Sequence, residues 1–290
     1  MSPSPALLNA LRRSRFNLRH AVASQGVGER RSKQKGSGME FADFRDYQPG
    51  DDVRHLDPHL HARHGGYFVR QYSVDRQVPV TIVLDASASM DFGAPNKFAF
   101  ARDLAAALAF VGLSGGDVVQ IVACRDGRTH MSSRIHGASR APILFGWLDE
   151  LSPSGKGFGE TLQSVRQHLP ARGLTFLISD FWFENPESDL KSLGSANQEF
   201  VALHIATAEE LNPAAMSTGE TRLVDAETGH EVELQIDDAA LERYGRAFAA
   251  WRERLREQFS RLQGRYILLR ADQRLDDVLL RDWRRLGLIS

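Results

Sequence analysis

Three oxygen-bearing side chains stand at alternate positions directly after a short apolar run. The run Val80–Leu84 ends at Asp85, and Ser87 and Ser89 follow, each separated from the last by one alanine. Alternate residues of a turning loop can direct their side chains toward one point, and a carboxylate with two hydroxyls is a ligand set that suits Mg²⁺. The stretch therefore predicts a metal site. A serine-rich turn in which Asp85 caps the next helix is the other interpretation.

A second carboxylate and a hydroxyl are expected to reach the same place. Asp180 follows the apolar run LTFLIS, and the carboxyl ends of parallel strands meet at one edge of a sheet, so Asp180 is expected near Asp85. The glycine-rich stretch GKGFGETL precedes a helix expected to begin at Glu160 or Thr161, and this loop can deliver one of those side chains. The candidate metal ligands are Asp85, Ser87, Ser89, Thr161 and Asp180. Whether Glu160 or Thr161 faces the metal stays open.

Apolar strands alternating with helices account for most of the chain after residue 79. Strands are expected at 80–84, 117–124, 129–135, 174–179, 199–206 and 265–269, and helices at 97–112, 139–151, 161–169 and 276–286. Such alternation predicts an α/β fold with a doubly wound, mainly parallel sheet covered by helices on both faces. Arg222–Leu234 interrupts the pattern with two alternating runs around Glu227-Thr228-Gly229, which predict a β-hairpin inserted near 213–236.

The residues before the first strand are expected to form two further parts. Residues 1–36 hold eight Lys or Arg and one acid, a local charge of 8 − 1 = +7, and predict a basic helix over Leu7–Ala23 followed by an arm. The charge suits an acidic partner or a solvated face, and no aromatic interleaving supports nucleic-acid binding. Residues 37–78 predict a smaller accessory unit, which leaves 79–290 for the α/β domain.

Composition limits where and how the protein acts. The 290 residues carry a formal net charge of −1, so the chain as a whole has no strong attraction to nucleic acid or to an anionic membrane. Cys124 is the single cysteine, so an internal disulfide is excluded. It lies in the apolar run VVQIVAC, which predicts a buried thiol. No stretch approaches the ~20 apolar residues of a membrane span, and no secretory signal is recognisable. A cytoplasmic protein without a membrane span is expected.

These motifs together resemble a known bacterial family. DASAS, Thr161 in a glycine-rich loop and the aspartate of ISD resemble the metal-ion-dependent adhesion site (MIDAS) of von Willebrand factor type A domains. The block GMEFADFRDYQPGDDVRHLDPHLHAR resembles the signature of DUF58 proteins, and the resemblance spans roughly residues 36–290. It implies a type A-like fold, a bound Mg²⁺ (or Mn²⁺ or Ca²⁺) and a carboxylate-bearing protein ligand. It also implies non-enzymatic, chaperone-like action with a MoxR-type AAA+ ATPase.

Two positions depart from the family pattern. The family's loop reads Gly-Thr-Asp-Leu, whereas residues 159–162 read GETL, so alignment on the leucine puts Glu160 in the place of the ligand threonine. Pro58 replaces the usual tryptophan after Asp57, and a proline disfavours helical geometry at the residue before it.

Two other functions compete with a metal-dependent interaction module. Asp85 at a strand end resembles the nucleophile of haloacid-dehalogenase phosphotransferases, although Ser87 stands where such enzymes usually carry a second aspartate as acid and base. A metal-dependent phosphohydrolase is therefore one alternative. A type A-like domain with a degenerate, metal-free site that serves only as a scaffold is the other.

The accessory unit contains two further clusters. His55, His59, His61 and His64 lie within ten residues, a spacing that can bind zinc, but no cysteine or carboxylate pattern closes such a site. Exposed or hydrogen-bonded histidines in a charged loop are the simpler interpretation. Arginines lie among aspartates in FRDYQPGDDVRHLD, and Asp51, Arg54 and Asp57 are expected to hold the unit together through ion pairs. Binding of a partner is the other interpretation of this block.

Overall fold

The computed structural model describes residues 3–17, 39–49, 51, 56–74, 77–156, 158–182, 186–194, 197–212, 219–227 and 229–290. The chain divides into a larger unit, Met1–Ala23 with Val78–Ser290, and a smaller unit, Ser24–Gln77. The smaller unit is thus inserted in the sequence of the larger one. The predicted basic arm, together with Arg54 and His55, lies outside the described residues.

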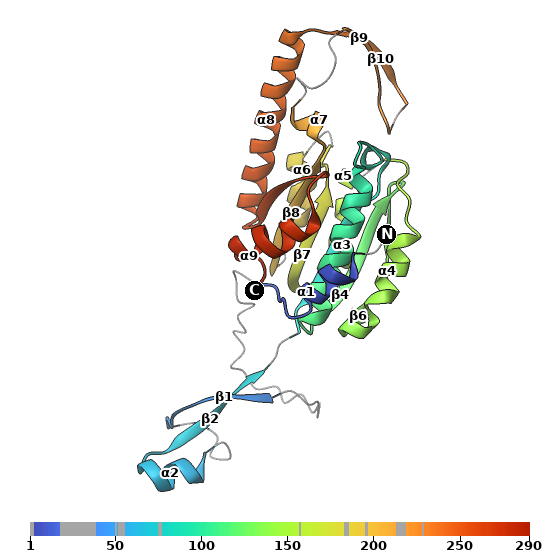
Figure 1. Cartoon of the computed structure of the whole chain (residues 1–290). Coiled ribbons are helices and arrows are strands. Elements are labelled where there is room, and N and C mark those ends of the chain that lie inside the picture. The colour runs from blue at the N-terminus through green and yellow to red at the C-terminus, as the bar shows by residue number, and fades with distance from the viewer. Residues whose placement is uncertain are drawn as a thin grey trace. The chain divides into compact units, whose positions relative to one another are not determined.

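A seven-stranded sheet forms the centre of the larger unit (Figure 1). Its strands are β3 (Pro79–Asp85), β4 (Val118–Arg125), β5 (Arg128–Met131), β6 (Ile135–His136), β7 (Arg172–Ser179), β8 (Asn197–Ala206) and β11 (Arg265–Arg270). The order is β11-β8-β7-β3-β4-β5, with β6 also paired to β4. All pairs are parallel except β4–β5 and β4–β6. The predicted doubly wound, mainly parallel α/β fold is confirmed.

Helices cover both faces of this sheet because strand residues alternate in direction. On one face, Ile82 and Leu84 join the core under α1 (Pro5–Leu11), α3 (Lys97–Ser114), α4 (Ala141–Asp149) and the C-terminal helical segments Asp277–Asp282 and α9 (Trp283–Arg285). On the other face, Val83 joins a second core under α5 (Phe158–His168), α6 (Pro186–Leu193) and α8 (Asp238–Arg261). The short helix α7 (Ala208–Leu211) follows β8.

The strand order reverses beside β3. From β3 the chain moves to β4 on one side and later returns to β7 on the other, from which it continues to β8 and β11. In open α/β sheets, ligands bind outside the carboxyl ends of the strands at such a switch point. A ligand site is therefore expected at the carboxyl ends of β3 and β7.

Several helices differ from the sequence-based prediction. The helix predicted over Leu7–Ala23 is interrupted, because α1 ends at Leu11 and Phe16 forms a β-bridge with Ile289, while residues 18–23 lie outside the described residues. Helix α5 begins at Phe158, earlier than the expected Glu160 or Thr161. Helices α6 and α8 were not predicted, although the buried face of α8 recurs at helical spacing through Phe248, Trp251, Leu255 and Phe259.

The two ends of the larger unit are paired with each other. Backbone hydrogen bonds join Arg15 N to Ser290 O at 3.2 Å and Ser290 N to Arg15 O at 3.0 Å, on either side of the bridge between Phe16 and Ile289. The Phe16 ring packs 5.1 Å from that of Phe176 in the sheet. The N-terminal segment is therefore part of the larger unit's core.

The predicted hairpin is present as β9 (Gly219–Val224) and β10 (Glu231–Ile236), which pair antiparallel. In Figure 1 it follows α7 and precedes α8, and its tip turns back toward the sheet. Thr228, in the turn, lies outside the described residues.

The smaller unit contains the antiparallel pair β1 (Met39–Asp46) and β2 (Phe68–Val74) and the helix α2 (Pro58–His64). Asp57 is the extended N-cap of α2, and its Oδ1 accepts hydrogen bonds from the backbone N–H groups of His59 at 2.9 Å and Leu60 at 3.1 Å. Pro58 occupies the first helical turn, where its missing N–H costs nothing. The geometry expected at Asp57 is thus confirmed, and the residue caps a helix.

Candidate metal centre

Asp85, Ser87 and Ser89 converge at the carboxyl end of β3. Ser87 donates to Asp85 Oδ1 from both its hydroxyl, at 2.7 Å, and its backbone N–H, at 2.9 Å. The hydroxyl oxygens of Ser87 and Ser89 lie 3.0 Å apart. Asp85 and Ser87 are buried and Ser89 is partly exposed. The alternate spacing therefore produces a compact cluster of oxygens with Ser89 on its open side.

Backbone contacts with two neighbouring segments fix this turn. Ala86 N donates to Cys124 O on β4 at 2.9 Å, and Ala88 N donates to Gly155 O at 2.9 Å. Ser154 N donates in turn to Ala86 O at 2.9 Å. The loop after α4 is therefore bonded directly to the turn that carries the serines.

Asp180 stands at the end of β7 beside this cluster and is paired with a lysine. Lys97 Nζ, at the start of α3, lies 2.7 Å from Asp180 Oδ2 and 2.8 Å from Glu210 Oε1. Glu210 is held in α7 by a capping box with Thr207, in which each side chain accepts the other residue's backbone N–H. The buried ammonium group is thus shared between two carboxylates.

Burial and charge shift the pKa values of the central groups in predictable directions. Burial, and then the negative charge of Asp180, raise the pKa of Asp85 to about 7, although hydrogen bonds from Ser179 and Ser87 oppose the rise. Burial lowers the pKa of Lys97, but the charges of Asp180 and Glu210 outweigh it and raise that pKa. The two aspartates are therefore close enough to repel each other.

Thr161 and Glu160 both lie away from the oxygen cluster's hydrogen bonds. Thr161 is buried, and its hydroxyl donates to Phe158 O at 2.8 Å within its own helix and also contacts the Cys124 thiol. Glu160 is exposed on the same helix. Of the five predicted ligands, the structure brings Asp85, Ser87, Ser89 and Asp180 together. Thr161 contacts Cys124 instead and remains a predicted ligand.

Four further residues belong to the site and were not predicted. Ser179 donates to Asp85 Oδ2 at 2.6 Å. Lys97 pairs with Asp180, and Glu210 is the second carboxylate that shares its ammonium group. Glu227, at the hairpin tip, is half-buried, and burial and then the negative charge of Asp180 raise its pKa. Ser179 adjoins Asp180 and is detectable from its position, whereas the other three reach the site only through the fold.

Cys124 and the described histidines of the smaller unit are not organised for metal binding. Burial raises the pKa of the Cys124 thiol to about 12, in keeping with the predicted inert thiol. His59 and His61 are exposed, and the His61 ring stacks on Tyr67 at 4.3 Å. His55 and the His64 side chain lie outside the described residues. In the described part of the chain, no three His, Cys, Asp or Glu side chains gather as a metal-binding group.

The residues at the β3 end nevertheless fit a small divalent cation. Asp85 and Asp180 supply two carboxylates, Ser87 and Ser89 supply neutral hydroxyls, and all are hard oxygen donors. A set with only two carboxylates retains coordination positions for water or for an outside ligand.

Within the described ranges, no helix is long and apolar enough to cross a membrane.

A doubly wound sheet with an Asp-x-Ser-x-Ser turn after its central strand, and a second aspartate after the adjacent strand, defines a von Willebrand factor type A-like protein. The family model described as "Protein of unknown function DUF58" matches residues 43–254. The chain belongs to the DUF58 family. The family predicted from the sequence motifs is thus confirmed.

Two relatives from mycobacteria match most of this chain. "Uncharacterized protein Rv1480" of Mycobacterium tuberculosis and "Uncharacterized protein Mb1516" of Mycobacterium bovis are each 29% identical over 262 residues, which cover 86% of this chain and 80% of theirs.

Two solved structures are similar at low identity. The "conserved hypothetical protein BatB" of Bacteroides thetaiotaomicron has 14% identity and a TM-score of 0.43, over 72% of this chain and 97% of that one. The "SpRpn10 VWA domain" has 14% identity and a TM-score of 0.42, over 71% of this chain and 94% of that one.

Proposed function

We propose that this protein is a non-enzymatic interaction module that binds a carboxylate of a partner protein through a divalent cation. Asp85, Ser87, Ser89 and Asp180 would hold the cation, with Mg²⁺ favoured by the all-oxygen donor set and Mn²⁺ or Ca²⁺ as substitutes. The observation that carries the proposal is the convergence of these four side chains at the switch point of the sheet. An open coordination position is what would allow a partner's carboxylate to bind.

The partner proposed is a MoxR-type AAA+ ATPase, with the module assisting chaperone-like assembly or maturation of other proteins in the cytoplasm. Membership of the DUF58 family supports this choice through the family resemblance described above. No nucleotide-binding loop of the G-x-x-x-x-G-K-[ST] kind occurs in the sequence, so ATP hydrolysis would belong to the partner.

Titration of Mn²⁺ by calorimetry tests the metal site. Wild type is expected to bind one Mn²⁺, Asp85→Ala is expected to lose that binding, and Asp91→Ala is the matched control. Asp91 lies in the same loop, but it is exposed and its carboxylate accepts a hydrogen bond from Asn96 at 2.8 Å. Equal Mn²⁺ affinity in wild type and Asp85→Ala would remove the site.

Recovery of the partner tests the role of the metal. The tagged chain is expected to recover an AAA+ ATPase from its native host in Mg²⁺, and to recover less of it in EDTA or with Asp85→Ala. Metal binding without metal-dependent recovery would remove the proposed role while leaving the site in place.

One observation favours the metal-free scaffold as a second candidate. The Lys97 ammonium group already lies 2.7 Å from Asp180, so the protein carries its own cation at one side of the site. The calorimetric titration separates the two candidates, because a scaffold whose site is closed by Lys97 binds no Mn²⁺.

A phosphohydrolase is disfavoured by the engagement of Asp85. Its Oδ1 accepts from Ser87, its Oδ2 accepts from Ser179, and the side chain is buried, so the carboxylate is not accessible to a phosphate ester. We expect no turnover of p-nitrophenyl phosphate with Mg²⁺, and turnover that is lost in Asp85→Ala would restore the enzyme hypothesis.

A further inference from the structure

The strand β11 forms an open edge of the central sheet. It pairs with β8 on one side, and no strand of the described residues pairs with its other side. Along a strand, the backbone N–H and C=O groups of successive residues point alternately to the two sides. Ala271 N donates to Ala206 O, at the end of β8, at 2.9 Å, so the odd-numbered residues of β11 point toward β8. Tyr266, Leu268 and Arg270 therefore point outward.

Hydrogen bonds within the chain cap the two ends of this edge but not its middle. Arg270 N donates to Gln273 Oε1 at 3.0 Å, and Gly264 N, just before the strand, donates to a carbonyl in the last turn of α8 at 2.8 Å. In the part of the chain that the structure describes, the outward N–H and C=O groups of Tyr266 and Leu268 have no hydrogen-bond partner. Such an edge is a template for another strand. The middle of β11 can therefore accept one.

A hollow with an apolar wall adjoins this edge. It has a volume of about 240 Å³ and is lined by Arg265, Tyr266, Ile267, Leu286 and Leu288. Leu286, in the turn after α9, is 57% exposed, whereas Leu288 is buried. Burial of the exposed Leu286 surface by an apolar side chain would be favourable. An added strand would thus gain side-chain packing as well as backbone hydrogen bonds.

Arginines flank the edge on both faces of the sheet. Arg284 and Arg285, which end α9, are exposed, and no carboxylate of the described residues pairs with them. On the other face, the Arg256 guanidinium lies 5.9 Å from the centre of the Tyr266 ring, and residues 252–261 of α8 carry four Arg and two Glu, a local charge of 4 − 2 = +2. A second copy would bring the same arginines into a symmetric interface, where they would repel one another. Charge therefore favours a different protein with acidic residues.

We propose that the β11 edge is a second interaction site, which adds an extended segment of a partner protein to the sheet as one more strand. The segment pairs with the backbone groups of Tyr266 and Leu268. Its apolar residues occupy the hollow beside Leu286, and its acidic residues lie toward the arginines. This site is separate from the oxygen cluster at the β3 end and needs no metal, so it does not depend on the function proposed above.

Synthetic peptides added to the full chain test the edge. The probes are two pools of heptapeptides, in which Val, Leu or Phe alternates with Glu in one pool and with Lys in the other. Hydrogen exchange of single amides is followed by NMR. The Glu pool is expected to protect the amides of Tyr266 and Leu268, whereas those of Ile267 and Leu269 already point toward β8 and should not change. The Lys pool should bind at least about tenfold more weakly.

A proline at position 268 tests the backbone pairing. Leu268→Pro removes an outward N–H but no hydrogen bond to β8, and proline is tolerated in an edge strand at such a position. Leu268→Ala is the matched control, because it also shortens the side chain but keeps the N–H. The Glu pool should bind Leu268→Pro about tenfold more weakly than Leu268→Ala. If Leu268→Pro does not fold, the exchange of the wild-type amides decides the question alone.

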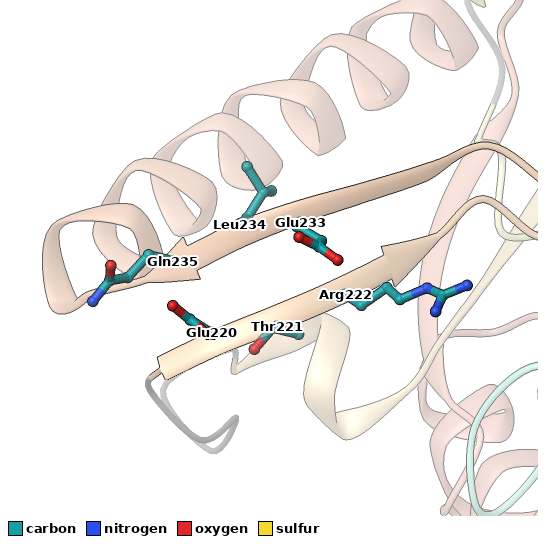
Figure 2. Close-up of a pocket in the computed structure, with 6 residues that line it drawn as sticks. All are labelled: Glu220, Thr221, Arg222, Glu233, Leu234 and Gln235. Carbon is teal, nitrogen blue, oxygen red and sulfur yellow. The ribbon is translucent and has the colours of Figure 1, made fainter.

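Two exposed leucines in different hollows test the apolar contact. Leu286→Ser is expected to weaken binding of the Glu pool about fivefold, because it removes the apolar wall. Leu234→Ser is the control and should leave binding unchanged. Leu234 is 47% exposed and belongs to the β9–β10 hairpin. Figure 2 shows the hollow that it lines there with Glu220, Thr221, Arg222, Glu233 and Gln235.

Three results would overturn the proposal. The first is an absence of protection at Tyr266 and Leu268 with the Glu pool at about 1 mM, which would mean that the edge has no useful affinity for a strand. Equal binding of the two pools would overturn the choice of an acidic partner. Protection of the same amides without peptide, on raising the protein concentration, would assign the edge to a second copy of the chain.

Discussion

Lys97 is a buried cation whose charge is matched by two carboxylates on different elements. Its side chain is 2% exposed and those of Asp180 and Glu210 are 1% and 14% exposed. Removal of one member of such a network leaves the others buried and unpaired, which costs more than the pair contributes when it is intact.

Lys97→Met is therefore expected to lower the free energy of unfolding by about 3–5 kcal/mol in EDTA. Mg²⁺ should restore part of the loss, because a cation bound between Asp85 and Asp180 supplies the missing positive charge and stabilises the folded state by mass action. Urea unfolding with and without Mg²⁺ measures both effects. Lys191→Met, an exposed lysine on α6, is the control and should change stability by less than about 0.5 kcal/mol. Equal losses with and without Mg²⁺ would argue that no cation reaches Asp180.

The part of the site that lies within one turn was predictable from the sequence. Asp85, Ser87 and Ser89 are local neighbours, and their spacing alone sets their convergence. Lys97 meets Asp180 across 83 residues and Glu210 across 113, and those contacts depend on how α3, β7 and α7 pack. Sequence spacing carries no information about such pairs. Thr161 was predicted to reach the site, but its hydroxyl is hydrogen-bonded within its own helix.

At the scale of the elements, the register between β3 and β7 rests on a close backbone approach. A Cβ atom at Gly173 would lie 2.3 Å from the carbonyl oxygen of Pro79, whereas one at Gly146, on the exposed side of α4, would meet nothing within 4 Å. Close packing therefore requires a glycine at position 173, whereas position 146 has room for a side chain.

Gly173→Ala is expected to destabilise the fold by about 1–3 kcal/mol or more, because the two strands that end at Asp85 and Asp180 must separate to admit the methyl group. Gly146→Ala is expected to stabilise it by about 0.5–1 kcal/mol, since alanine loses less backbone entropy in a helix. Thermal unfolding of both variants tests the pair, and a neutral Gly173→Ala would show that the sheet adjusts at this edge.

The elements themselves were largely predictable, because apolar strands of a parallel sheet are distinctive. The central strands β3, β4, β7, β8 and β11 lie where the apolar runs predict them. Helix α1 was overextended because a basic, periodic stretch favours a helix, while the pairing of Phe16 with Ile289 is a long-range contact that overrides it. Helix α8 has a clear periodic face, so the sequence did contain its signal.

For the whole molecule, the smaller unit is a sequence insertion that contributes nothing to the larger unit's described core. Both apolar core clusters draw all their residues from outside Ser24–Gln77. Replacement of residues 24–77 with a Gly/Ser linker of about 15 residues should therefore leave the larger unit folded, with a cooperative thermal transition. A variant that lacks such a transition would show that the insertion is required for folding.

The pairing of Arg15–Phe16 with Ile289–Ser290 determines when the N-terminal segment can complete its pairing during synthesis. A ribosome that adds about 5–20 residues per second completes the partner of Phe16 roughly 14–55 s after Phe16 itself. During that interval Phe16 is already part of the nascent chain, but the residue that pairs with it has not been added. Until Ile289 and Ser290 are added, Arg15 and Phe16 lack their backbone partners.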